Sequence, residues 1–329
     1  MPMRIKILAT GKYLPKNRVT AADLEERLGL ETGWIAKKSG VMVRHFVEGE
    51  TASQMGAFAA SEALHGAGLG IEDIDCLVCT SSVPEQAIPC TAALVQQQLG
   101  AGESGIPAFD LNATCLSFLC GLDTLSYLVA AGRYRRVLLI ATEVTTGMNW
   151  SDKESCTLFG DGAAAVIIES SPEGERSEIL AARIETYSHG AALSECRGAG
   201  NKHHPKQYFD NPEFFLFTMQ GRALYRLSAQ ILPTFLERLL QPIQCTLEDM
   251  KMVIPHQASL MAMRLIRKHL GVREERWMTI AHNHGNTVAA SIPMALHEAV
   301  VQKKIRRGDR ILLLGTAAGF SVGGIVLVY

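Results

Sequence analysis

Three residues that lie far apart in the sequence have side chains suited to chemistry on acyl thioesters. Cys115 begins an apolar helical pattern, His256 follows the apolar run 252–254, and Asn286 precedes a second helical pattern. A cysteine thiolate is a nucleophile that forms acyl intermediates, histidine serves as a base or donor, and asparagine can only donate or accept hydrogen bonds. Each residue is expected where a strand gives way to a turn or helix, so rigid elements can hold the three around one cavity. This set favours carbon–carbon bond formation through an acyl-cysteine.

The position of Cys115 predicts an activated thiol. Unpaired N–H groups and aligned peptide dipoles at a helix N-terminus favour negative charge, so we expect the pKa of this thiol to be lowered. The helix that follows is apolar on nearly every side, which leaves its first turn as the part that can face a cavity. The alternative is a buried structural cysteine, which behaves as a small apolar residue. The apolar positions of this helix are Leu116, Phe118, Leu119, Leu122, Leu125, Leu128 and Val129.

The elements that must hold these residues predict an α/β protein. Short runs rich in Val, Ile and Leu, at 74–79, 108–111 and 137–142, alternate with helical patterns near 91–99 and from 115 onward. Runs without polar alternation are typical of strands that are covered on both faces.

A weak internal repeat predicts a duplicated fold. The helix from Cys115 ends in a basic turn and leads into the strand 137–140, and a second helix after Asn286 ends in a similar turn and leads into 311–314. A glycine-containing turn and an apolar strand follow in both places. We expect a boundary in the polar stretch 170–176, which gives halves at 1–171 and 172–329. Packed about a pseudo-twofold axis, the halves would make Cys115 and Asn286 equivalent positions that face one site.

Composition limits the classes of function. The 329 residues are 47% hydrophobic and carry a formal net charge of -1, so no overall field favours nucleic acid. No apolar run reaches the roughly 18 residues that a membrane span needs, and the first residues do not resemble a signal peptide. Eight scattered cysteines without a secretory signal indicate free thiols in a reducing cytoplasm.

Other motifs favour structural roles. Cys76 and Cys79 form a C-x-x-C pair, but on a strand they would point to opposite faces, so we expect no metal site. The segment Phe159–Gly162 lacks a lysine and precedes a strand, and it predicts a tight hairpin turn with positive φ rather than a phosphate loop. The stretch 190–212 has little periodicity and reads as a surface excursion near the substrate entrance or a partner subunit, or as a plain loop.

Taken together, these motifs resemble the thiolase-fold condensing enzymes, and most closely the β-ketoacyl-ACP synthase III family. The likeness covers nearly the whole chain and includes a Cys, His, Asn order that differs from relatives with two histidines or a second cysteine. It implies a duplicated αβαβα layered fold. The residues that carry it are 112–115, 255–259, 284–291 and 317–320, with 11–15, Trp34-Ile35 and Phe159–Gly162 in support.

The resemblance implies a mechanism. Cys115 would attack an acyl-CoA, while the backbone N–H groups of Cys115 and Ala318 hold the oxyanion. A malonyl thioester would then lose carbon dioxide, and His256 and Asn286 would donate hydrogen bonds to the enolate oxygen before it attacks the acyl-Cys115. Neither a metal nor a cofactor beyond the CoA thioester substrates is implied.

The resemblance also implies binding residues and partners. Trp34 would stack on the CoA adenine, with Lys38 and Lys153 near its phosphates, where the family commonly has arginine. Ile88 would cap the acyl pocket of the partner in a homodimer and leave room for more than acetyl. Further substrate contacts are implied for Phe159, Ser259, Gly319 and Phe320.

Two departures weaken one part of the resemblance. Ser259 and Met261 stand where fatty-acid enzymes of this family carry Asn and Arg, which assist the pantetheine arm and face the acyl carrier protein. Met261 offers neither charge nor a strong hydrogen bond. The acceptor is therefore malonyl-ACP or malonyl-CoA, and the sequence favours a variant that serves a specialised pathway.

Other classes of protein remain open at this point. The same scaffold could transfer an acyl group from Cys115 to an alcohol or amine, or condense two acyl-CoA molecules without decarboxylation. A scaffold subunit without catalysis would leave Cys115 unacylated. Papain-like proteases share the Cys, His, Asn order, but the residues around Cys115 lack their signature.

Overall fold

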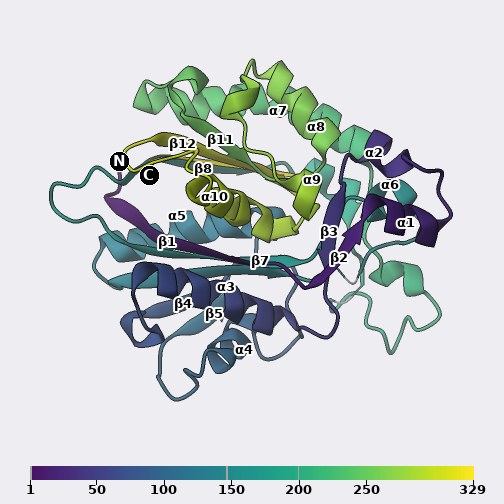
Figure 1. Cartoon of the computed structure of the whole chain (residues 1–329), viewed down its shortest axis with the longest axis horizontal. Helices are drawn as coiled ribbons and strands as arrows, with labels where there is room; N and C mark the ends of the chain where they lie inside the picture. The colour runs from purple at the N-terminus through teal and green to yellow at the C-terminus, as the bar shows by residue number, and fades with distance from the viewer. Residues whose placement is uncertain (1, 146, 199) are drawn as a thin grey trace.

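The computed structural model describes residues 2–145, 147–198 and 200–329, and its strands form two main sheets (Figure 1). The first sheet has the order β1-β7-β6-β4-β5, with β4 parallel to β5 and β6 and with β7 antiparallel to its neighbours. Its strands are β1 (Ile5–Tyr13), β4 (Cys76–Cys79), β5 (Ala108–Asp110), β6 (Arg136–Glu143) and β7 (Gly162–Ser170).

The second sheet repeats this pattern with one strand fewer. Its order is β11-β12-β13-β8, in which β11 and β12 are parallel and the other pairs antiparallel. The strands β4, β6, β7 and β1 therefore correspond in order and direction to β11, β12, β13 and β8, as a duplicated fold requires. The strands of this sheet are β8 (Glu178–Thr186), β11 (Met252–Pro255), β12 (Arg310–Ala317) and β13 (Ser321–Val328).

The helices form three layers around the two sheets (Figure 1). Helices α3 and α4 cover the outer face of the first sheet, α5 and α10 lie between the sheets, and α7 and α8 cover the second. The predicted αβαβα layering is confirmed. These helices are α3 (Ala52–Ala67), α4 (Thr91–Gln98), α5 (Ser117–Ala130), α7 (Gly221–Leu240), α8 (Leu260–His269) and α10 (Ser291–Val301).

Three hydrophobic clusters explain why the strands are apolar on both faces. On β4, Cys76 and Val78 pack into the cluster between the sheets, whereas Leu77 and Cys79 pack under α3 and α4. The two cysteines thus point to opposite faces, as predicted. On β12, Ile311 enters the central cluster and its neighbours alternate to the outer cluster under α7. Alternate side chains of one strand serve two different helix layers.

Smaller elements extend from one side of the layers. Two short sheets pair β2 (Asn17–Thr20) with β3 (Val43–Phe46), and β9 (Ser194–Glu195) with β10 (Thr218–Met219). The excursion predicted at 190–212 lies mostly between β9 and β10.

Short helices and 3-10 turns complete the chain. The short helices are α1 (Ala21–Leu28), α2 (Trp34–Lys38), α6 (Lys153–Cys156) and α9 (Ala281–His284). The 3-10 turns are η1 (Ile71–Asp73), η2 (Thr114–Leu116), η3 (Ser188–Leu193), η4 (Pro212–Phe215), η5 (Gln241–Ile243), η6 (Leu247–Asp249), η7 (Glu274–Arg276) and η8 (Val288–Ala290).

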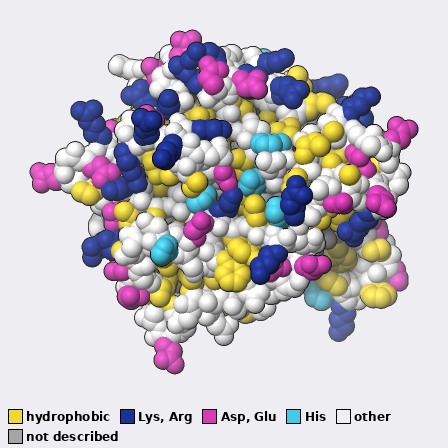
Figure 2. Space-filling model, viewed as in Figure 1, with side chains coloured by type: hydrophobic (Ala, Val, Ile, Leu, Met, Phe, Trp, Pro, Cys, Tyr) yellow, Lys and Arg dark blue, Asp and Glu magenta, His cyan; other side chains and the backbone are white. Residues whose placement is uncertain are grey.

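Charges of both signs occur on the face of the molecule that Figure 2 shows. Lys and Arg side chains are interspersed with Asp and Glu over the face shown in Figure 2, in keeping with the balance of 32 basic and 33 acidic residues. Within the described part of the chain, none of the helices is both long and apolar enough to cross a bilayer.

Candidate active site

The three candidate residues come from elements that contact one another. Cys115 lies in the turn η2, which contacts both β12 and the turn η8 that follows Asn286. His256 follows β11, the parallel neighbour of β12, and its N–H donates to the carbonyl of Leu314 (2.8 Å). A Cβ on Gly315 of β12 would lie 2.9 Å from Leu116 Cδ2 and 3.2 Å from His256 Cβ, so this glycine allows the two neighbours to approach. The structure therefore brings the three residues to one end of the central layer.

Hydrogen bonds fix the backbone of Asn286 and the oxygen of its side-chain amide. Its N–H donates to the Leu158 carbonyl (2.7 Å), and its own carbonyl accepts from Gly160 N–H (3.2 Å). Its Oδ1 accepts from Val288 N–H at 2.9 Å, while no described protein group accepts from its Nδ2. Val288 has a φ of 47°, which is unusual for a β-branched residue. This turn fixes the amide plane and leaves the NH₂ group available to a ligand.

His256 is buried and neutral at neutral pH. Burial lowers the pKa of its imidazole from 6.5 to about 4. Its Nδ1 lies 2.6 Å from Ser291 Oγ, and that oxygen also accepts from Gln257 N–H at 3.3 Å. With Gln257 as the donor to Ser291, the hydroxyl hydrogen can go to Nδ1, which places the imidazole proton on Nε2. A neutral Nε2–H group is a hydrogen-bond donor for a developing oxyanion.

Cys115 is not the activated thiol that its position predicts. Burial, and next the charge of Glu143, raise the pKa of the thiol to about 12, although the backbone N–H groups of Ala318 and Cys115 act in the opposite direction. The expectation of a lowered pKa is wrong because burial and the Glu143 charge outweigh the two backbone N–H groups; Cys115 itself lies in the turn η2, directly before α5 begins at Ser117. The side chain is nevertheless partly accessible. The resting thiol is therefore protonated at neutral pH.

The loop between β12 and β13 carries the predicted oxyanion amide. Residues Ala318, Gly319 and Phe320 join these two antiparallel strands, with φ of 87° at Gly319 and 43° at Phe320. The Ala318 carbonyl accepts a hydrogen bond from Thr114 Oγ1 (3.3 Å), and Phe320 is buried. The amide of Ala318 acts on the Cys115 thiol. The loop thus aligns one N–H beside the sulfur through a contact to the residue before Cys115.

The residues predicted to grip the CoA nucleotide lie together on α2 and α6. Lys38 Nζ is 5.9 Å from the centre of the Trp34 ring and pairs with Glu154 at 3.2 Å. Lys153 donates instead to the carbonyl of Trp150 (3.0 Å). Because Glu154 neutralises the exposed Lys38, a phosphate group would have to compete with this carboxylate. Sequence reasoning did not identify Glu154, although it stands next to Lys153.

The remaining predicted substrate residues are dispersed. Phe159 is buried and packs edge to face on Phe217 (5.5 Å between ring centres), in a cluster that includes Val288 beside Asn286. Ser259 is the N-cap of α8, but its side chain makes no capping hydrogen bond. Ile88 is 85% exposed.

The segment Phe159–Gly162 is not the predicted hairpin turn. Phe159 forms a parallel bridge with Asn286, and neither Gly160 nor Gly162 has a positive φ. A Cβ on Gly160 would lie 2.4 Å from the His284 carbonyl oxygen. Close backbone packing, rather than a left-handed conformation, requires glycine here. The segment therefore supports the Asn286 turn.

Sequence reasoning also missed a buried carboxylate beside the site. Glu143 ends β6, is 2% exposed, and accepts hydrogen bonds from Ser82 N–H (2.6 Å) and Ser82 Oγ (2.7 Å). Burial raises the pKa of this carboxyl to about 7. A charged residue that directly follows the apolar run 137–142 was the available signal, because such a residue must find partners when the strand end is buried.

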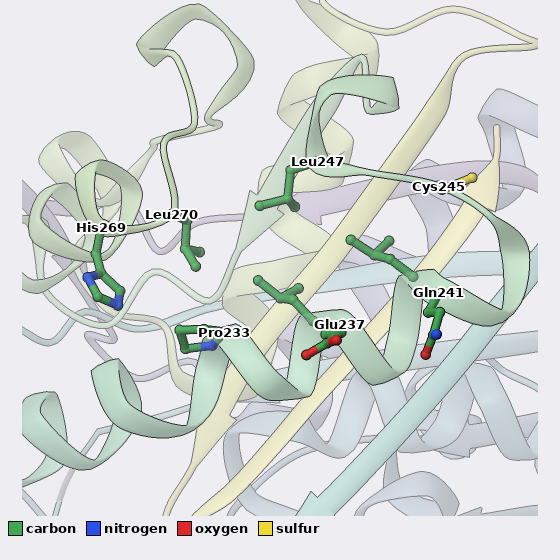
Figure 3. A pocket seen from close by; sticks show the side chains of 9 residues that line it. Pro233, Glu237, Gln241, Cys245, Leu247, His269 and Leu270 are labelled. Carbon is green, nitrogen blue, oxygen red and sulfur yellow. The ribbon is translucent and has the colours of Figure 1, made fainter.

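Two surface grooves lie away from these residues. One of about 490 Å³ lies between α7 and the end of α8, with Glu237, Cys245 and His269 on its walls (Figure 3). Another of about 770 Å³ lies beside Trp277 and Arg310. Cys115, His256 and Asn286 line neither groove. No cluster of three or more potential metal ligands occurs among the described residues.

Comparison with known proteins gives a consistent result. Family models match the chain at 109–188 (3-oxoacyl-[acyl-carrier-protein] synthase III) and at 240–329 (the C-terminal part of the same family). The chain is 35% identical to beta-ketoacyl-[acyl-carrier-protein] synthase III of Aquifex aeolicus, covering 99% of this chain and 100% of the relative. The Neisseria gonorrhoeae protein of the same name is 33% identical, at 98% and 99%. The crystal structure of the Aquifex aeolicus synthase superposes with a TM-score of 0.89 at 33% identity, covering 99% of this chain and 100% of that chain.

Proposed function

Because the chain belongs to the β-ketoacyl-ACP synthase III family of condensing enzymes, we propose that it joins an acyl-CoA primer to a malonyl thioester by decarboxylative Claisen condensation. One observation carries the proposal. The Cys115 turn η2 contacts η8, which follows the uncommitted amide of Asn286, and β12, whose Leu314 carbonyl accepts from the N–H of His256, a neutral imidazole. A nucleophile together with two neutral hydrogen-bond donors suits a thioester and its enolate.

In the first half-reaction, the Cys115 sulfur attacks the acyl-CoA carbonyl and CoA leaves with the thiol proton. The N–H groups of Cys115 and Ala318 stabilise the oxyanion, and one such donor is typically worth about 3 to 4 kcal/mol. Because the pKa of the resting thiol is about 12, no free thiolate accumulates, and the thiol proton passes to the CoA sulfur as the new thioester bond forms and the CoA thioester bond breaks. His256, whose pKa is about 4, stays neutral throughout.

In the second half-reaction, a malonyl thioester binds and loses carbon dioxide. The Nε2–H of His256 and the Nδ2 of Asn286 donate to the enolate oxygen, and the enolate carbon attacks the acyl-Cys115 carbonyl. The Cys115 sulfur leaves once the new carbon–carbon bond has formed, and it takes up a proton from solvent to restore the thiol. Ser291 supports this step because its contact with Nδ1 (2.6 Å) keeps the histidine proton on the side away from the serine.

The substrate carriers form a further part of the proposal. Trp34, Lys38 and Lys153 bind the CoA nucleotide, and the cluster around Phe159, with Gly319 and Phe320, borders the acyl and pantetheine path. Met261 on α8 is 53% exposed and offers an acyl carrier protein no charge. We therefore propose a specialised pathway, with malonyl-ACP and malonyl-CoA both as candidate acceptors and no cofactor beyond these thioesters.

The proposal also includes a homodimer in the cytoplasm. Strand β5 is one of the two edge strands of the first sheet, Phe109 on it is 38% exposed, and Ile88 from the loop after β4 is 85% exposed. An open strand edge with exposed apolar side chains suits pairing with a second copy, in which Ile88 would cap the partner's acyl pocket. All eight cysteines are free, which supports a reducing compartment.

Separate assays of the two half-reactions test this function. Incubation with acyl-CoA primers of graded length should add the acyl mass to wild-type protein but not to Cys115→Ala, as read by intact mass spectrometry. The acylated wild type should then release carbon dioxide from a malonyl thioester. Acylation without carbon dioxide release would indicate acyl transfer or non-decarboxylative condensation instead. A wild-type chain that takes up no acyl group from any primer would exclude both.

A further inference from the structure

The buried carboxylate of Glu143 is hydrogen-bonded to the loop that supports Cys115. Both of its oxygens accept from the same residue, one from Ser82 N–H (2.6 Å) and the other from Ser82 Oγ–H (2.7 Å). The amides of Val83 and Ala289 also face this carboxylate. Ala289 belongs to η8, so Glu143 contacts the loop after β4 on one side and the turn after Asn286 on the other.

A continuous chain of hydrogen bonds runs from Ser82 to the peptide before Cys115. The Ser82 carbonyl accepts from Asn112 Nδ2 at 2.7 Å, and Asn112 Oδ1 accepts from Thr114 N–H at 2.8 Å. Thr114 has a φ of 52°. A β-branched residue adopts this left-handed conformation at a cost of about 1 to 2 kcal/mol, so surrounding contacts must hold it.

Thr114 has such contacts on several sides. Its carbonyl accepts from Ser117 Oγ (2.6 Å), and its own hydroxyl donates to Ala318 (3.3 Å). Ser117 Oγ also lies 3.3 Å from the Ser81 carbonyl. The residues that fix the left-handed peptide thus depend on the 81–82 loop, and Glu143 is the group that anchors this loop at Ser82.

We propose that Glu143 is a positioning residue for the nucleophile: its carboxylate anchors Ser82, and through Ser82 and Asn112 it holds the Thr114–Cys115 peptide in the orientation that presents the sulfur to a thioester. The inference rests on the proposed function and deepens it. It also assigns an electrostatic consequence to the same group, because the Glu143 charge adds to burial, the larger cause, in opposing thiolate formation at Cys115. The resting cysteine is aligned for its substrate, yet it is kept protonated until it attacks the thioester.

Replacement of Glu143 by glutamine separates these two effects. Glutamine keeps one acceptor for Ser82 but removes the charge. In the full chain, we expect Glu143→Gln to lower the maximal rate of Cys115 acylation at least tenfold with little change in the half-saturating acyl-CoA concentration, since the nucleotide binds elsewhere. We expect the pH midpoint of Cys115 alkylation by iodoacetamide, followed by peptide mass, to move to lower pH. Loss of packing alone would not produce this pair of opposite changes.

Glu169→Gln is the matched control. Glu169 is a part-buried carboxylate on β7 that binds Arg136 Nε at 2.8 Å, at the other end of β6. The length of β6 separates it from Glu143 by about 23 Å. In this variant, the acylation rate should stay within twofold of the wild type. The pH midpoint of alkylation should match the wild type within experimental error.

Asn112→Asp tests the same hydrogen-bond chain at an exposed position, with a side chain of nearly the same size. Aspartate keeps the acceptor for Thr114 but loses the donor to Ser82, so acylation should slow severalfold. Combined with Glu143→Gln, its effect should be smaller than the product of the two single effects, because both act through Ser82.

Wild-type rates of acylation in both variants, or an alkylation midpoint that does not fall in Glu143→Gln, would overturn the inference. A wild-type protein that no acyl-CoA acylates would instead refute the proposed function. The iodoacetamide midpoint would still be measurable in that case.

Discussion

The two halves of the molecule contain the same corner, used in two different ways. Each corner begins with an asparagine, passes through a β-branched residue of positive φ in a 3-10 turn, and ends at the serine that begins a central helix. In each, the asparagine Oδ1 accepts from the residue of positive φ, at 2.8 Å in the first half and 2.9 Å in the second. The corresponding residues, at equal spacing, are Asn112, Thr114 and Ser117, and Asn286, Val288 and Ser291.

The difference lies in what the second group of each asparagine does. In the first half, Asn112 Nδ2 donates to Ser82, so its amide is entirely structural and the corner presents Cys115. In the second, Asn286 Nδ2 has no acceptor among the described residues, and Ala289 stands where the cysteine would be. Duplication thus supplied one rigid frame twice. In the proposed function, one copy serves a nucleophile and the other a donor.

Replacement of each asparagine by alanine should slow a different half-reaction, and these are the largest effects we expect. Asn286→Ala should leave Cys115 acylation near the wild-type rate and slow decarboxylation of the malonyl thioester about 100- to 1,000-fold, the usual loss for one oxyanion donor. Asn112→Ala should slow acylation first, because it releases Thr114. Acyl uptake by intact mass and release of labelled carbon dioxide measure the two steps separately. Equal losses of both steps in Asn286→Ala would contradict the assignment.

The titratable groups at the corners are also asymmetric, and they should have opposite effects on stability. Glu143 ends β6 where Ala317 ends β12, and His256 follows β11 where Thr80 follows β4. The pKa of Glu143 rises from 4.5 to about 7, so between these pH values only the unfolded chain has lost this proton and stability falls as pH rises. The pKa of His256 falls from 6.5 to about 4, so stability rises with pH over that interval.

These opposite slopes predict what each variant does to folding. Each group changes the free energy of unfolding by about 3 kcal/mol across its interval, and the two contributions nearly cancel between pH 4.5 and 6.5. Glu143→Gln should therefore make the free energy of unfolding rise with pH over this range, by up to about 1.4 kcal/mol per unit relative to wild type. His256→Ala should make it fall. Urea unfolding at pH 4.5, 5.5 and 6.5 measures both slopes, and parallel curves for all three proteins would show that neither group is perturbed.

Sequence patterns predicted an α/β class with a duplicated architecture, and the resemblance to condensing enzymes implied the αβαβα layers. Apolar runs such as 137–142 predicted strands covered on both faces, and the structure confirms this because alternate residues of each strand enter different clusters. The boundary between residues 171 and 172 and the roles of Cys115, His256 and Asn286 remain predictions. The repeat was recognised, but Cys115 was paired with Asn286, whereas the matching hydrogen bonds pair Asn112 with Asn286.

What the sequence could not provide depends on contacts between distant segments. The raised pKa of Cys115 follows from burial and from Glu143, which no local pattern around the cysteine reveals. The local pattern assigns Gly160 to a turn, because glycine is common in turns. In the structure, glycine is required there because a side chain would clash with the carbonyl of His284, far away in sequence. A helix N-terminus is a local signal, and here the tertiary environment outweighs it.

The serines that begin the two central helices offer the finest comparison, with the smallest effect. Ser291→Ala removes the partner of His256 Nδ1 (2.6 Å), so the imidazole proton is no longer directed to Nε2. One such hydrogen bond is worth about 1 kcal/mol, so decarboxylation should slow roughly five- to tenfold while acylation is unchanged. Ser117→Ala removes the donor to the Thr114 carbonyl and should slow acylation by a similar factor. Each serine should thus affect only the step that its own corner serves. If Ser291→Ala slowed acylation as much as decarboxylation, the histidine would act on both steps, and the division of labour between the corners would be wrong.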